Sequence, residues 1–331
     1  MMKELYQKHF EKELVRDGAT ALLRRENNAE QSSISFFHLM PGVELAYNFF
    51  RGHQSAEAEP TPETKNMIEI NHCRQGRFGC TLPGDQQVYL GTGEIGANIL
   101  GVSRANAEFP LGFYEGITIL LDVPTAMQSL HPMFPVLADQ IQLLKQQLEE
   151  SGGAMMIQNI PELNHVFEEL YHVNPQIEQT YLTLKTLEIL LTMQLVPYAR
   201  DKAAPRYYKH SEMERIKALH RAATQNLEQR MTFAQLAAAQ GFSLSGAKEA
   251  FKQLYGEPYA SYMRKYRMHK ALHYLESTSY SIAEIAGKVG YDNPSKFSSA
   301  FQSVVGCTPR EYRNNPNHLE HFTVVGVEIE E

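Results

Sequence analysis

Residues 281–312 read SIAEIAGKVGYDNPSKFSSAFQSVVGCTPREY, and residues 232–262 read TFAQLAAAQGFSLSGAKEAFKQLYGEPYASY. The two stretches repeat one pattern, with one residue inserted in the later copy. The paired positions are Ala237 and Ala286, Gly241 and Gly290, Phe251 and Phe301, Gly256 and Gly306, and Tyr262 and Tyr312. Because a solenoid needs at least three stacked repeats, two copies indicate a module that acts twice on a periodic target.

Each copy has the pattern of a helix-turn-helix. An amphipathic helix precedes Gly241 in one copy and Gly290 in the other, and glycine ends a helix by accepting a positive φ. Ser243 and Asp292 are the expected N-caps of the helices that follow. The apolar positions of these second helices are Ala247, Ala250, Phe251 and Leu254 in the first copy and Phe297, Ala300, Phe301 and Val304 in the second. Two helices joined by a short glycine turn are typical of DNA binding.

Residues 211–313 resemble the DNA-binding domain of the AraC/XylS transcription regulators. The second copy carries the resemblance, as S-I-A-E-I-A-x-x-V-G-Y-x-N-P-S-x-F-S-x-A-F-x-x-x-x-G-x-T-P-x-E-Y-R from Ser281 to Arg313. The resemblance implies seven helices, with motifs at about 232–254 and 281–304 whose second helices enter the major groove. A helix at about Tyr259 to Leu275 would join them. At 1.5 Å per residue it spans roughly 25 Å, and successive major grooves on one DNA face lie about 34 Å apart.

The outward positions of the two second helices are expected to meet the DNA. Lysine binds guanine or phosphate, serine contacts either strand edge, and glutamate accepts from cytosine N4. The predicted DNA-binding residues are Ser245, Lys248, Glu249, Lys252, Ser295, Lys296, Ser299 and Arg310. The simpler alternative is that the lysines form a solvated helix face. Gly246 and Glu249 depart from the family, in which many members carry basic or long polar residues there, so the first motif is expected to bind more weakly or to choose other bases.

The charge of the chain is unevenly distributed. Residues 211–313 hold 14 Lys+Arg against 9 Asp+Glu, a net charge of +5, and the remainder holds 17 against 29, a net charge of −12. A basic domain on an acidic chain is the electrostatic pattern of a nucleic-acid interface confined to one end.

The remaining composition excludes several classes of protein. No run of 18 apolar residues occurs, so no membrane span is expected, and MMKELYQKHFEKELVRDG at residues 1–18 lacks the apolar core of a secretory signal. Three cysteines cannot build a disulfide framework, which favours a cytoplasmic location. His72, Cys73 and Cys80 come nearest to a metal cluster, but adjacent strand residues point to opposite faces. No metal and no cofactor are expected.

Residues 1–125 are predicted to form a β domain. Short runs rich in β-branched and aromatic residues, between about 32 and 122, alternate with turn sequences at Pro41-Gly42, Pro83-Gly84-Asp85 and Gly91-Thr92-Gly93. This pattern suggests a sandwich or barrel, and the family resemblance implies a cupin-like barrel that binds an effector. Candidate effector contacts are Asn71, His72, Arg74, Phe78 and Tyr89. Two alternating sets run along residues 68–74, and the sequence leaves open which set faces inward. The effector itself stays open between a sugar, a siderophore, a peptide and a fatty acid.

Helical patterns follow the β domain. Residues 126–200 carry apolar stripes of helical spacing. The last of them lies in YLTLKTLEILLTMQL and is apolar well beyond one narrow face of a helix. It is buried either on the barrel or, as we prefer, on a second subunit, which makes this region a dimerisation element. Residues 201–210 are predicted to be a linker, and no role is assigned to the tail at 314–331.

The predicted fold class is therefore α+β: an N-terminal cupin-like β domain, a helical region and an all-α DNA-binding domain. The predicted function is sequence-specific transcription regulation, most readily activation, under the control of a small-molecule effector, and not an enzymatic activity. Expected partners are double-stranded promoter DNA, RNA polymerase, the effector and a second copy of the chain. One alternative is a ligand-independent regulator whose β domain only dimerises. Another is a DNA-repair alkyl-transfer protein, which needs a zinc-activated cysteine cluster, although Cys307 is the one cysteine in 211–313.

Overall fold

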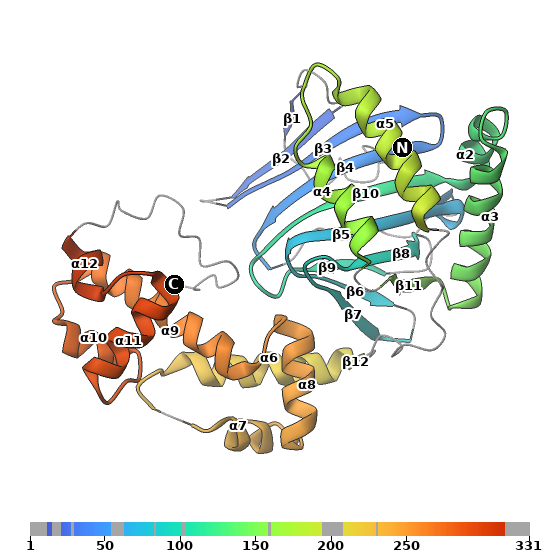
Figure 1. Cartoon of the computed structure of the whole chain (residues 1–331). Helices are drawn as coiled ribbons and strands as arrows, with labels where there is room; N and C mark the ends of the chain where they lie inside the picture. The colour runs from blue at the N-terminus through green and yellow to red at the C-terminus, as the bar shows by residue number, and fades with distance from the viewer. Residues whose placement is uncertain are drawn as a thin grey trace. The chain divides into compact units, whose positions relative to one another are not determined.

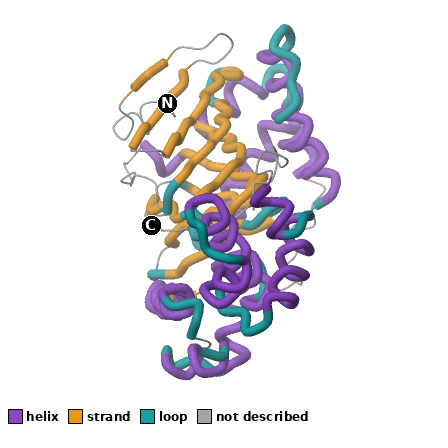
Figure 2. The backbone as a smooth tube through the Cα atoms, turned by 90° about the vertical axis from the view of Figure 1, so that its left-hand side faces the viewer, coloured by secondary structure: helices purple, strands orange, loops and turns teal. Residues whose placement is uncertain are grey.

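The chain divides into two compact units, Met1–Lys209 and His210–Glu331. The computed structural model describes residues 12–14, 21–27, 30–53, 63–82, 84–100, 104–157, 160–193, 208–229 and 231–314. Within these ranges every strand belongs to the first unit and the second unit is entirely helical (Figure 1; strands are orange in Figure 2). The α+β fold class is confirmed.

Two antiparallel sheets build the first unit. The larger sheet has the strand order β1-β2-β3-β4-β10-β5-β8-β11, and the smaller has the order β12-β7-β6-β9. The strands are β1 (Lys12–Leu14), β2 (Ala21–Asn27), β3 (Glu30–Met40), β4 (Val43–Arg51), β5 (Met67–Gly76), β6 (Phe78–Leu82), β7 (Gln86–Leu90), β8 (Ile95–Ile99), β9 (Arg104–Glu108), β10 (Phe113–Asp122), β11 (Ala154–Ile157) and β12 (Tyr208–Lys209). A short 3-10 helix, η2 (Glu63–Asn66), precedes β5.

The turn sequences lie where the hairpins need them. Gly42, between β3 and β4, has φ of 81°, Gly84 has φ of 81° between β6 and β7, and Gly93 has φ of 77° before β8. Two strands fall outside the β domain predicted at residues 1–125: β11 pairs with β8 from within the predicted helical stretch, and β12 pairs with β7 from within the predicted linker. Both strands form by backbone pairing with strands that are distant in the sequence. Strands of four and two residues are too short to show a period-2 pattern from which they could be predicted.

Four helices follow β10, and they pack on one face of the larger sheet (Figure 1). They are α2 (Val123–Leu130), α3 (Pro135–Glu150), α4 (Pro161–Leu170) and α5 (Glu178–Thr192). Asp122 caps α2 by accepting from the Thr125 amide at 3.1 Å. The buried stripes of α3, α4 and α5 form one apolar core with alternate residues of the sheet, including Ile68 and Ile70 of β5 and Ile117 of β10. The wide apolar face of α5 is thus largely buried within the unit.

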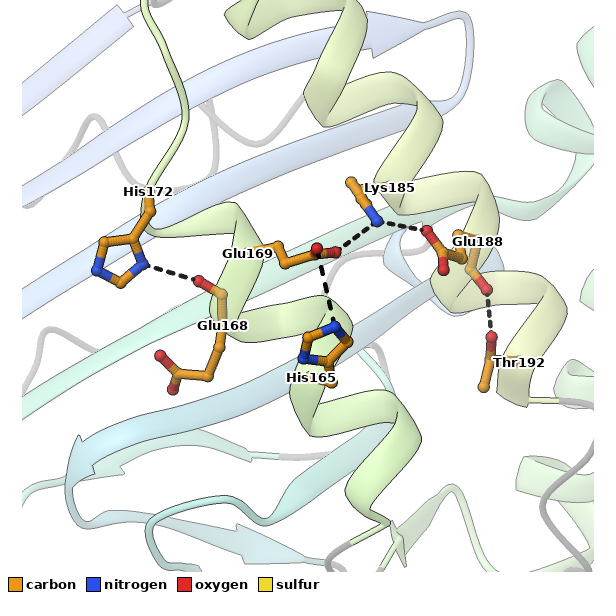
Figure 3. Close-up of polar contacts among 7 residues, drawn as sticks. All are labelled: His165, Glu168, Glu169, His172, Lys185, Glu188 and Thr192. Carbon is orange, nitrogen blue, oxygen red and sulfur yellow. Dashed lines mark hydrogen bonds and ion pairs between the residues drawn. The ribbon is translucent and has the colours of Figure 1, made fainter.

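Ion pairs join α4 to α5 on the side away from the sheet. Lys185 of α5 lies 2.5 Å from Glu169 of α4 and 2.8 Å from Glu188 of its own helix, as Figure 3 shows. The hydrogen bond to Glu169, followed by that to Glu188, raises the pKa of Lys185. His165 approaches Glu169 to 3.8 Å. Because these groups are near the surface, solvent screens each pair and its contribution to stability is small.

The second unit has seven helices within its described residues, as the family resemblance implied. They are α6 (His210–Gln225), α7 (Phe233–Ala239), α8 (Leu244–Tyr255), α9 (Tyr259–Ser277), α10 (Ile282–Lys288), α11 (Pro294–Val305) and α12 (Pro309–Asn314). The helix expected between the motifs is α9, with 19 residues and a length of about 28 Å. It packs against α8 of the first motif and against α10, α11 and α12 of the second.

Candidate functional site

Reciprocal caps fix the first helix of each motif. The Thr232 amide donates to Gln235 Oε1 at 2.9 Å, and the Gln235 amide donates back to Thr232 Oγ1 at 3.3 Å. Ser281 and Glu284 repeat the arrangement at 2.7 and 3.2 Å. Hydrogen bonds from Ser281 lower the pKa of the Glu284 carboxyl. Such capping boxes satisfy two orphan amides at once, so α7 and α10 each begin at a defined residue.

The turn and the second helix of each motif follow from glycine and a polar cap. Gly241 and Gly290 adopt φ of 70° and 78°. Ser243 caps α8 as predicted, accepting from the Gly246 amide at 3.1 Å. The prediction of Asp292 as the second cap is wrong, because Asn293 occupies that place.

Asn293 caps α11 with one side-chain oxygen, which accepts from the amides of Ser295 and Lys296 at 2.8 and 3.2 Å. The extra residue of the second copy therefore lies in the turn, ahead of the cap. Ser243 corresponds to Asn293, and α8 and α11 begin at equivalent positions.

Each second helix buries one face and exposes the other. The side chains of Ala247, Ala250, Phe251 and Leu254 on α8 are buried, as are those of Phe297, Phe301 and Val305 on α11, whereas Ala300 and Val304 are half-buried. All eight predicted DNA-binding residues are exposed: Ser245, Lys248, Glu249, Lys252, Ser295, Lys296, Ser299 and Arg310. Seven of them lie on α8 and α11, and Arg310 lies in the first turn of α12. Gly246 is half-buried beside its cap.

Two arginines, which the sequence reasoning missed, hold the turns of the two motifs. Arg215 of α6 donates from Nη1 to the carbonyl oxygen of Gln240 at 3.2 Å, and its guanidinium lies 4.3 Å from the ring centre of Phe242. Arg267 of α9 donates from Nη1 to the carbonyl oxygens of Val289 and Gly290, at 2.9 and 3.1 Å. In both motifs the arginine satisfies carbonyls that the end of a helix leaves unpaired.

The duplication consequently extends over three helices in each half, α6 to α8 and α9 to α11. A signal for it exists in the sequence. Buried Ile216 and Leu219 stand one and four residues after Arg215. Buried Met268 and Ala271 stand at the same distances after Arg267.

The β domain holds a cavity between its two sheets. Its volume is about 20 Å³, room for about one water molecule, and its lining comes from β5, β6, β7, β8 and β11. Most of the lining is aliphatic, aromatic or sulfur-bearing, and the two amides are Asn71 and Asn98.

The five predicted effector contacts do not gather at this cavity. Asn71 and Phe78 line it. His72 lies on the opposite face of β5, where its ring stacks on Phe167 of α4 with a centroid distance of 4.3 Å. Arg74 is on that face too, paired with Glu115 at 2.7 Å. Tyr89 is fully buried and donates to Gln87 Oε1.

Strand alternation explains this separation. Ile68, Ile70, His72 and Arg74 form the set that faces the helices, and the set containing Asn71 and Cys73 faces the smaller sheet. His72 and Cys73 accordingly point apart. Among the described residues, no three His, Cys, Asp or Glu side chains gather as a metal ion would require. No helix in the same ranges is long and apolar enough to cross a membrane.

Comparison with known proteins places the similarity in the C-terminal part of the chain. A family model described as a helix-turn-helix domain matches residues 236–315. The HTH-type transcriptional activator RhaR of Mannheimia succiniciproducens is 30% identical over 128 residues, which cover 39% of this chain and 44% of RhaR. A putative AraC-like transcription regulator of Streptomyces antibioticus is 35% identical over 85 residues, covering 26% of this chain and 28% of that protein. The chain thus spans less than half the length of these relatives.

A solved structure is also similar to part of this chain. The C-terminal domain of AraT, a response regulator from Geobacillus stearothermophilus, is 29% identical, and the match covers 33% of this chain and 90% of that domain with a TM-score of 0.30. The duplicated motif, its seven helices and the sequence matches agree on a helix-turn-helix domain, in the C-terminal part of this chain, that is similar to those of AraC-like regulators.

Proposed function

We propose that this protein is a sequence-specific transcriptional regulator that places α8 and α11 in successive major grooves of promoter DNA. The observation that carries the proposal is the pair of equivalent helices, both presenting exposed serine and lysine side chains and both packed against α9. The length of α9, about 28 Å, is compatible with the spacing of about 34 Å between grooves.

The two recognition helices differ in what they offer the DNA. The first presents Lys248 and Lys252 on either side of Glu249, whereas the second presents Lys296 with Ser295 and Ser299. A carboxylate repels phosphate and accepts from cytosine N4, and serine contacts either strand edge. The two half-sites are therefore unequal in sequence, and the first motif contributes more to base choice than to general affinity.

The direct test is competition binding of the full chain to the DNA upstream of its own gene. We expect binding to that DNA to survive an excess of a scrambled competitor. The affinity should fall steeply with salt, because each neutralised phosphate contributes about −0.9 to the slope of log K against log salt. Equal binding to promoter and scrambled DNA at every salt concentration would remove the proposal.

We further propose that the protein acts as an activator through RNA polymerase, and that a small molecule in the cavity of the β domain controls it. The mainly apolar lining of the cavity, with the two amides of Asn71 and Asn98 among it, favours control by a ligand over a β domain that only dimerises. Transcription in vitro from the bound promoter, with and without cell metabolites, tests this part. Output that no metabolite changes would contradict it.

A homodimer is the remaining part of the proposal. Ile177, at the N-cap of α5, and Leu184 and Leu191 within the helix follow one another at seven-residue spacing, and their side chains are 54%, 60% and 46% exposed. Intervening residues of α5 are buried in the core of the unit. Exposed apolar residues in such a row favour contact with a second copy of the helix, which would bring four recognition helices to the DNA.

A further inference from the structure

A leucine is exposed at the start of the first recognition helix. Leu244 is the first residue of α8, directly after the cap Ser243, and its side chain is 44% exposed. Among the described residues of α8 and α11, no other large aliphatic or aromatic side chain is exposed to this degree. Single leucines are common on protein surfaces, so the place of this one decides whether it has a role.

The place of Leu244 is the end of the helix that meets the bases. In a helix-turn-helix, the N-terminal residues of the second helix contact base edges in the major groove. Lys248 lies one turn after Leu244 on the same side of α8. The first turn of α8 holds no acidic side chain, and Ser245 and Gly246 are small. The bases can therefore approach the leucine without meeting a longer neighbour in the same turn.

The second recognition helix differs at the equivalent position. Its cap is Asn293, and its first residue is Pro294, which is also exposed. The proline ring is fixed to the backbone, whereas the leucine side chain extends away from the helix. The two helices therefore begin with apolar residues of different reach, and α8 is the one whose first residue can extend to a base.

The major groove offers one apolar group to such a side chain. Base edges there present hydrogen-bond donors and acceptors, and thymine adds its C5-methyl group. Leucine has no donor or acceptor, so against the polar edge of another base it would remove water without replacing the hydrogen bonds. Against a methyl group, both partners gain from leaving water.

We propose that Leu244 is a specificity-determining residue, whose side chain packs on the C5-methyl group of a thymine in the DNA that α8 contacts. The inference rests on the proposed sequence-specific DNA binding and assigns one base preference to one residue. Burial of one methyl-sized group changes an equilibrium constant about fourfold. Leucine neutralises no phosphate, so the contact leaves the salt dependence of binding unchanged.

The test uses the full chain and the upstream DNA to which it binds. Each thymine of the protected site is replaced singly by uracil, which removes the C5-methyl group and keeps every hydrogen-bonding group. We expect uracil at one or more positions to weaken binding of the wild type about fourfold. Leu244→Ala should bind the thymine and uracil duplexes equally at those positions, with the wild-type slope of log K against log salt.

Two further variants serve as controls. Met231→Ala shortens another exposed apolar side chain, 48% exposed, which lies just before α7 and outside the recognition helices. It should keep the wild-type preference for thymine. Leu244→Met preserves an apolar side chain of similar size and should keep that preference too.

Three results would overturn the inference and leave promoter binding standing. They are a wild type indifferent to uracil at every thymine, a Leu244→Ala variant with the wild-type preference, and a Leu244→Ala variant with an altered salt slope. Equal binding of the wild type to promoter and scrambled DNA would instead remove the proposed function together with the inference.

Discussion

Gly290 and Gly306 share a left-handed backbone, with φ of 78° and 91°, but differ in their surroundings. A Cβ at Gly290 would lie 2.2 Å from both Arg267 Nη1 and the carbonyl oxygen of Leu227, whereas nothing lies within 4 Å of a Cβ at Gly306. Gly306→Ala should lower the free energy of unfolding by about 1–2 kcal/mol, the strain of the backbone alone. Gly290→Ala should lose a further 1–3 kcal/mol, roughly, through the steric clash.

Urea denaturation of the full chain, followed by circular dichroism, measures the difference between these glycine variants. The two substitutions are matched because each adds one methyl group at a helix end of the same motif. Equal losses of stability would show that the Leu227 carbonyl, between α6 and α7, does not clash with a side chain at position 290 in the turn of the second motif.

His72 gives the fold a specific sensitivity to acid. Burial lowers the pKa of this imidazole to about 4, against a side-chain hydrogen bond with Asn164 that raises it, and its Nδ1 has no hydrogen-bond partner among the described residues. The unfolded chain takes up this proton near pH 6.5 and the folded chain only near pH 4, so stability falls as the pH drops through that window. The loss reaches about 3 kcal/mol at the acid end.

His72→Phe should flatten this part of the pH profile, because phenylalanine preserves a ring against Phe167 and does not titrate. Denaturation midpoints between pH 4 and 8 measure the effect. Above pH 7 the imidazole is neutral in both the folded and the unfolded state. A difference in stability between the variant and the wild type at that pH therefore reports packing alone. A variant as acid-sensitive as the wild type would assign the destabilisation to other groups.

At the scale of the element, each three-helix half depends on its own arginine. Removing Arg267 takes away its hydrogen bonds to the Val289 and Gly290 carbonyls, which hold the turn before α11. Removing Arg215 takes away the hydrogen bond to the Gln240 carbonyl in the turn before α8. We expect Arg267→Ala to weaken DNA protection over one half-site and Arg215→Ala over the other, each with a stability loss of about 1–2 kcal/mol.

Footprinting of both arginine variants on one promoter fragment measures this selectivity, and each variant is the control for the other. If either substitution removed protection from both half-sites equally, the halves would act as one rigid body, and the arginines would support general stability only.

The helices and strands also show which features of the fold could be predicted from the sequence. Both motifs could be predicted because a left-handed turn requires glycine, so that Gly241 and Gly290 fix the boundaries of the helices. The cap at Asn293 could not, since an inserted residue can lie on either side of a cap. The orientation of β5 was equally hidden: one of its faces packs on helices and the other on a sheet, so both alternating sets are buried. The exposed positions of α8 and α11 followed from the helical period, whereas only the fold shows that Asn71 and His72 lie on opposite faces of β5.

At the scale of the whole molecule, the division of charge separates two tasks. The net charge of +5 over residues 211–313 favours contact with a polyanion such as DNA, and the net charge of −12 over the rest disfavours it. A protein divided in this way gains affinity by joining two copies through its acidic part, since the second DNA contact becomes intramolecular.

The row of exposed apolar residues on α5 makes that assembly testable. Leu184→Asp together with Leu191→Asp should convert a dimer to a monomer in sedimentation equilibrium, because two carboxylates would face their copies across the interface and lose their hydration. The control is Gln142→Asp with Gln146→Asp, which adds the same charge to exposed polar positions of α3. The leucine variant should bind DNA that carries the site of one copy as the wild type does. It should lose the added affinity for DNA that carries two such sites. A wild-type chain that sediments as a monomer at every concentration would contradict the dimer and leave each copy to bind DNA alone.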